Sequence, residues 1–113
     1  MTKAYSVRWR LRFVARVRRE VATLNRSGNL HFSRLERWSN EWMLWCCGDD
    51  DAGERADLYF HMTRQRISGW ALRGAAGRLC VTKLDEVRSM DDVRHLVRAA
   101  TAQPALPAPA LAG

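Results

Sequence analysis

The chain has 113 residues, 47% of them apolar, which suits one domain with one hydrophobic core. No apolar run approaches the roughly 20 residues that cross a bilayer, and Arg8, Arg10 and Arg12 interrupt the N-terminal apolar positions, which argues against a signal peptide. The three cysteines are odd in number and two are adjacent, which does not fit a disulfide framework. We therefore expect a protein of a reducing, cytoplasmic compartment.

The net charge of +7 is unevenly distributed along the sequence. Residues 1–19 hold seven basic side chains and no acid, so this segment alone accounts for the net charge of the whole chain. Residues 49–57 are acidic, and residues 58–84 are basic without a carboxylate. Segregated charge of this kind favours an oriented electric field over an evenly mixed, solubilising surface.

The first element is predicted to be a strand. From Tyr5 to Val17 every odd position is apolar or small, and every even position except Val14 is polar, which is the period of a half-buried strand. We assign a strand to at least residues 4–14, followed by a turn at 25–29. A helix from Leu11 onward is the alternative, because its apolar residues also fit one arc of a helical wheel.

A helix is predicted over residues 34–46. Ser33 and Glu36 have the spacing of a capping box, and Gly48 stands where a helix would end. Helical spacing places the following residues on one stripe: Leu35, Trp38, Trp42 and Trp45. This stripe is expected to be core. The alternative is a buried strand at residues 42–47.

Three short strands are predicted next, at residues 58–63, 65–72 and 78–84, joined by tight turns into an antiparallel meander. Ser89 and two acids of the following turn predict the start of a closing helix. Residues 102–113 contain all three prolines and no charge, and are expected to form a disordered tail.

These elements predict an α+β fold in a single domain over residues 1–101. The small antiparallel sheet would consist of the N-terminal strand and the three-stranded meander, with two helices packed on one face. No internal repeat is present.

The N-terminal arginines are the leading candidates for function. In a strand, alternate residues from Arg8 to Arg18 would share one face, about 7 Å apart along the chain. Arginine is the preferred bidentate partner of phosphate, so the leading hypothesis is a small, arginine-rich, DNA- or RNA-binding protein. The candidate binding residues are Arg8, Arg10, Arg12, Arg16, Arg18, Arg19, Arg64, Arg66, Arg73 and Arg78.

The alternative hypothesis is a protein–protein interaction module. A basic and aromatic surface suits an inhibitor or adaptor that docks on an acidic partner protein, such as a bacterial or phage accessory protein. Tryptophans outside the core could contribute to that surface, or stack on bases. A membrane partner is not expected. The sequence is compatible with a homodimer but does not predict one.

No catalytic residue, metal site or cofactor is predicted. The three cysteines and the three histidines are too scattered for a zinc signature, and the acidic run at 49–51 lacks the alternating spacing of a calcium loop. The sequence contains neither a phosphate-binding glycine loop nor a nucleophile elbow. A non-enzymatic role is therefore expected; were the chain a hydrolase or transferase, His61 would be the histidine to follow.

Overall fold

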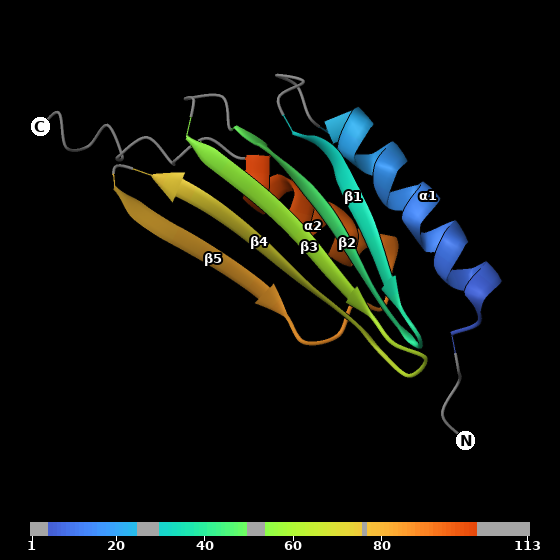
Figure 1. Ribbon diagram of the computed structural model, residues 1–113. Coiled ribbons are helices and arrows are strands. Elements are labelled where there is room, and N and C mark those ends of the chain that lie inside the picture. The colour runs from blue at the N-terminus through green and yellow to red at the C-terminus, as the bar shows by residue number, and fades with distance from the viewer. Residues whose placement is uncertain (1–4, 25–29, 50–53, 76, 102–113) are drawn as a thin grey trace, which may run out of the picture.

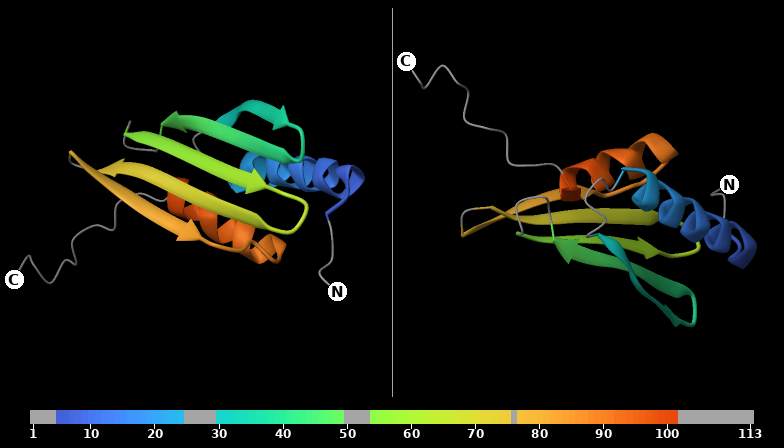
Figure 2. Two further views of the ribbon diagram at one scale, coloured as in Figure 1. Left: turned by 60° about the horizontal axis from the view of Figure 1, so that its bottom comes forward. Right: turned by 90° about the horizontal axis from the view of Figure 1, so that it is seen from above.

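Two helices cover one face of a five-stranded antiparallel sheet in the computed structural model, which describes residues 5–24, 30–49, 54–75 and 77–101 (Figure 1). In chain order the elements are α1 (Val7–Leu24), β1 (His31–Trp38), β2 (Glu41–Asp49), β3 (Arg55–Met62), β4 (Ile67–Ala75), β5 (Arg78–Leu84) and α2 (Met90–Thr101). Each strand pairs with the next in the sequence, so the sheet is an uninterrupted meander. Figure 2 shows both helices on the same side of this sheet. The predicted α+β class and the packing of helices on the sheet are confirmed.

The predicted N-terminal strand over residues 4–14 is wrong, because this segment is the helix α1. The apolar residues of α1 recur every three or four positions as far as Val21, which is longer than a strand sustains. Phe13, Val17 and Val21 are consequently buried against the sheet. The side chain of Ser6 caps the helix, since its Oγ accepts the Trp9 N–H at 3.1 Å. The alternative of a helix from Leu11 onward is therefore correct for that part, but the helix begins earlier, at Val7.

The predicted helix over residues 34–46 is also wrong, because β1 and β2 form a hairpin there. The alternative strand at 42–47 is confirmed within β2, where buried and partly exposed residues alternate. The proposed capping box does not form, since Glu36 pairs with Arg34 at 3.1 Å within β1. A turn through Ser39, whose φ is 53°, replaces the expected continuous helix. Gly48 lies inside β2 and ends no helix.

The later elements agree with the sequence. β5 matches its predicted strand, β3 and β4 overlap theirs with ends shifted by one to three residues, and α2 begins next to the predicted cap. The Asp92 N–H donates to Ser89 Oγ at 3.4 Å, and Asp92 Oδ2 accepts the Arg88 N–H at 2.8 Å. The predicted turn at 25–29, residues 50–53 of the acidic segment 49–57, and the tail at 102–113 lie outside the described residues.

The core lies between the inner face of the sheet and the two helices. α2 packs on β3, β4 and β5, while α1 lies beside α2 and over β1. Phe13 of α1 meets Phe60 of β3 edge to face, with ring centroids 5.4 Å apart. α2 approaches β4 closely at Gly69, where a Cβ atom would lie only 2.5 Å from Leu96 Cδ1. The absence of a side chain at Gly69 thus sets the distance between α2 and the sheet.

Replacing this glycine should destabilise the fold. Gly69→Ala is expected to lower the free energy of unfolding by about 1–3 kcal/mol, because Leu96 must leave its position. In a Leu96→Ala background the same change should cost much less, which a double-mutant cycle in urea would measure. Gly74→Ala, in the same strand, is the control: its nearest contact is Glu54 Oε2 at 3.3 Å, the end of a flexible side chain. Equal costs at Gly69 in both backgrounds would contradict this account.

Candidate nucleic-acid interface

The arginines of α1 lie on different sides of the helix rather than on the single face predicted for a strand. Four of them, Arg8, Arg12, Arg16 and Arg19, are exposed and share one arc opposite the buried stripe. We call these four residues the arginine row. Arg10 and Arg18, which were predicted to accompany them, face other parts of the protein. No carboxylate among the described residues lies within ion-pair distance of the arginine row.

A groove between α1 and the start of α2 adjoins the arginine row. It is lined by Trp9, Arg12, Phe13, Arg16, Val87, Arg88, Ser89 and Met90. Arg88 is held by Glu86 at 2.9 Å, and the acids of α2's first turn are also engaged. Asp91 pairs with Arg94 at 2.6 Å, while Asp92 accepts backbone N–H groups. Arg12 and Arg16 thus bring two guanidinium groups, which have no carboxylate partner in the described part of the chain, to the edge of a partly apolar groove.

Arg10 and Arg18 pack on aromatic rings of the first hairpin. Arg10 is 2% exposed, and its Nη1 donates to the backbone carbonyl of Asn40 at 3.0 Å. Its guanidinium lies 4.7 Å from the ring centroid of Trp42, and that of Arg18 lies 4.6 Å from Phe32. Burial, together with the like charge of Arg64, lowers the pKa of Arg10. These two arginines join α1 to the sheet, which the strand prediction could not foresee.

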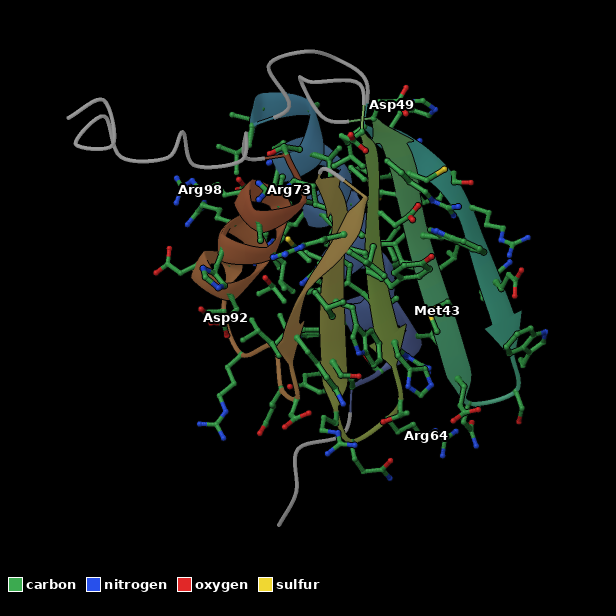
Figure 3. All side chains as sticks on the ribbon, turned by 90° about the vertical axis from the view of Figure 1, so that its left-hand side faces the viewer. Met43, Asp49, Arg64, Arg73, Asp92 and Arg98 are labelled. Atoms are coloured by element: carbon green, nitrogen blue, oxygen red, sulfur yellow. The ribbon has the colours of Figure 1, made fainter. Side chains whose placement is uncertain are left out.

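The remaining predicted arginines lie at two ends of the sheet. Arg64 and Arg66 are exposed in the β3–β4 turn, near the start of α1, where Arg64 O accepts the Tyr5 N–H. Arg73 and Arg78 lie at the opposite end, near the β4–β5 connection. Figure 3 labels Arg64 and Arg73 and shows this separation. The ten predicted residues therefore do not form one continuous surface.

The sheet face that carries no helix has an aromatic centre that the sequence analysis missed. Trp45, Tyr59 and Trp70 are adjacent on β2, β3 and β4, and the rings of Trp45 and Tyr59 are 4.9 Å apart. A cation flanks each end, with Arg34 over Trp45 at 4.2 Å and Lys83 over Trp70 at 5.7 Å. We call these five residues the aromatic row.

Charges on this face are largely paired, unlike those of the arginine row. Arg34 pairs with Glu36, Arg55 with Asp57, and Lys83 with Asp85, at 3.1, 2.7 and 3.4 Å. Burial, followed by the charge of Asp57, raises the pKa of Tyr59. This face is thus apolar at its centre and locally neutral.

The predicted tryptophan stripe does not exist. Trp42 is buried on the inner face, Trp45 lies on the outer face, and Trp38 is 63% exposed at the end of β1. The alternation with a period of two within residues 42–47 predicts this arrangement, since it places Trp42 and Trp45 on opposite faces of a strand. The helical spacing of Trp38, Trp42 and Trp45 favoured a helix instead.

The cysteines and histidines form no metal cluster within the described ranges. Cys46 and Cys47 are adjacent in β2 and therefore face opposite sides of the sheet, and both are free thiols, as is Cys80. Burial, then the neighbouring Cys47, raises the pKa of Cys46 to about 12. His61 Nε2 lies 3.4 Å from Glu41 Oε1 on the outer face.

Comparisons with protein-family models, curated proteins and solved structures find no match for this chain. Neither described helix has the length and apolar character needed to span a bilayer.

The three thiols should differ in reactivity. With an aromatic disulfide reagent, exposed Cys80 is expected to react first and Cys46 only when the protein unfolds. Raising the pH from 7 to 9 should not make Cys46 react in the folded protein, because burial raises its pKa to about 12 and keeps it a thiol. A Cys80→Ser variant, which should lose only the fast phase, is the control. Reaction of all three thiols in one fast phase would contradict the burial of Cys46.

Proposed function

We propose that the protein binds nucleic acid, DNA or RNA, through the arginine row of α1. The observation that carries this proposal is the set of four exposed guanidinium groups on one arc of α1, without a carboxylate partner in the described parts of the chain. Like charges held together in this way repel one another, and a polyanion relieves that repulsion while releasing its counterions.

The helix gives the arginine row a repeat suited to a phosphate backbone. Arg8, Arg12 and Arg16 are each four residues apart, which corresponds to about 6 Å along the helix axis. Guanidinium groups at such intervals contact successive phosphates, and phosphate contacts bind DNA and RNA without reading their sequence. We therefore propose an accessory role in binding rather than catalysis.

A second candidate function is a protein–protein interaction module, which the aromatic row favours. Tryptophan and tyrosine are enriched where proteins meet, and paired charges around an apolar centre resemble the rim and core of such an interface. The two candidates use opposite sides of the molecule. An acidic partner protein would instead compete with nucleic acid for the arginine row.

Removing charge from the arginine row should weaken nucleic-acid binding and flatten its dependence on salt. For Arg12→Gln/Arg16→Gln, the slope of log affinity against log salt concentration should fall in magnitude by about 2, since each lost phosphate contact contributes about 0.9. Fluorescence anisotropy with a labelled oligonucleotide from 50 to 300 mM salt would measure this slope.

The matched control is Arg78→Gln/Arg98→Gln, which removes the same charge from two exposed arginines outside the row. The salt slope of this control should change by less than half the change expected for Arg12→Gln/Arg16→Gln. If both double variants flatten the slope equally, binding follows net charge and the arginine row has no special part.

Nuclease treatment separates the two candidate functions. A tagged protein crosslinked in lysate should lose its captured partners after nuclease treatment if nucleic acid is what it binds. Partners that survive this treatment, and that are lost in Trp70→Ala but retained in Arg12→Gln/Arg16→Gln, would favour the protein–protein module.

A further inference from the structure

Arg10 is a buried cation without an anionic partner among the described residues. Its side chain is 2% exposed, and no carboxylate there forms an ion pair with it. A guanidinium has five N–H donors. In Arg10 one of them is bonded to Asn40 O, while Nε is buried and has no hydrogen-bond partner among the described residues. Burying a charge in this state is costly unless further hydrogen bonds or an opposite charge satisfy it.

The neighbours of Arg10 add positive charge. Trp42 offers its ring face to Arg10, but Arg37 approaches the same ring at 5.4 Å. Arg64 is also close enough for its charge to lower the pKa of Arg10. Two arginines thus share one tryptophan ring and a third lies near Arg10, and the cation–π contacts leave their mutual repulsion in place.

A hollow on the surface connects two of these arginines. It is lined by Tyr5, Ser6, Val7, Arg10 and Arg64. It lies at the end of the sheet where the start of α1 approaches the β1–β2 and β3–β4 turns (Figure 1). The Tyr5 N–H donates to Arg64 O at 2.6 Å, and Arg10 bonds to the β1–β2 turn through Asn40 O. Two turns and a helix end therefore fix the position of this hollow.

The helix end itself favours an anion. The first turn of α1 contains no acidic residue, so the positive end of the helix dipole is not neutralised there. Ser6 accepts the N–H groups of Trp9 and Arg10 through its Oγ and its carbonyl. The N–H groups of Val7 and Arg8 precede these and have no acceptor within the helix. Helix N-termini with free amides are well suited to phosphate.

We propose that this hollow is a phosphate-binding site in which Arg10 and Arg64 grip the anion and the first amides of α1 cap it. A phosphate group accepts hydrogen bonds from several directions at once, which matches two guanidinium groups and a helix end better than a planar carboxylate does. The identity of the ligand as a phosphate of a nucleic-acid strand rests on the proposed function; the site itself does not. Arg10 occupies the buried end of the site, and Arg64 the solvent side.

Titration with inorganic phosphate tests the site without nucleic acid. In two-dimensional ¹H–¹⁵N spectra at constant ionic strength, phosphate replacing chloride should shift the Arg10 Nε–H and the amides of Val7 and Arg8 along one saturable curve. Arg64→Gln should weaken this binding about tenfold, the effect of losing one charge-assisted hydrogen bond. Arg64 carries the test because it is exposed, whereas replacing Arg10 would also disturb Trp42 and Asn40.

Arg66→Gln is the matched control, since Arg66 is exposed in the same turn but does not line the hollow. It should change phosphate affinity less than twofold. Shifts that are absent, or that follow ionic strength alone, would overturn the site. Equal losses in Arg64→Gln and Arg66→Gln would overturn it as well, because they would indicate a diffuse field.

Oligonucleotides with a 5′-phosphate or a 5′-hydroxyl identify the source of the phosphate. If a terminal phosphate enters the site, the phosphorylated strand binds more tightly and Arg64→Gln removes the difference. If an internal phosphodiester enters, Arg64→Gln weakens both strands equally. Saturable phosphate binding without oligonucleotide binding would retain the site and refute the proposed function. If the salt slope depends on the arginine row but Arg10 does not respond to phosphate, the proposed function is retained and the phosphate site is refuted.

Discussion

The packing of α1 beside α2 over the inner face of the sheet is the constraint on which the rest of the molecule depends. The sheet has a wholly buried row at its centre, with Leu44, Leu58 and Phe60 almost without exposure, and this row needs cover from two helices. α1 supplies part of that cover through Phe13 and Val17. Because an α-helix has one apolar arc, orienting this arc towards the sheet fixes the direction of every other side chain on α1.

One consequence is that charge is divided between the two sides of the protein. On the helix side the arginine row has no carboxylate partner among the described residues, whereas the opposite sheet face pairs its cations with nearby carboxylates. Exposed ion pairs of this kind contribute little to stability, but they cancel the local field. This division is the reason for placing the proposed nucleic-acid contact on the helix side, while the aromatic row offers a neutral contact surface. Six of the seven basic residues of segment 1–19, whose charge equals the net charge of +7, lie on α1, an arrangement that favours a directional field.

The sequence predicted the second half of the fold better than the first, for reasons that particular residues explain. β3 to α2 have clear turn signals, and Ser89 and Asp92 cap α2 as expected. At the N-terminus, alternation and helical period coincide over residues 5–17, and only the long apolar stripe through Val21 separates them. In β1 and β2, helical spacing of tryptophans arose by coincidence within a hairpin whose turn passes through Ser39.

The candidate site was predictable to a similar degree. The exposed arginine row depends only on α1 being a helix, since Arg8, Arg12, Arg16 and Arg19 share an arc at that period. The aromatic row depends on the pairing of β2, β3 and β4, which brings together residues 14 and 11 positions apart in the chain. Pairing register is a property of the whole sheet, and local patterns do not contain it.

Arg10 shows that the choice between a strand and a helix period changes the functional interpretation of a residue as well as its structure. In a strand it would have been one more exposed cation, equivalent to Arg8 and Arg12. In α1 it enters the buried arc, where an apolar residue of similar volume would avoid the cost of desolvating a charge. Trp42 and Asn40 O offset part of this cost, but neither carries a negative charge. The same helical turn that exposes Arg8 and Arg12 therefore holds Arg10 in a position where an anion would complete its surroundings, as the proposed phosphate site requires.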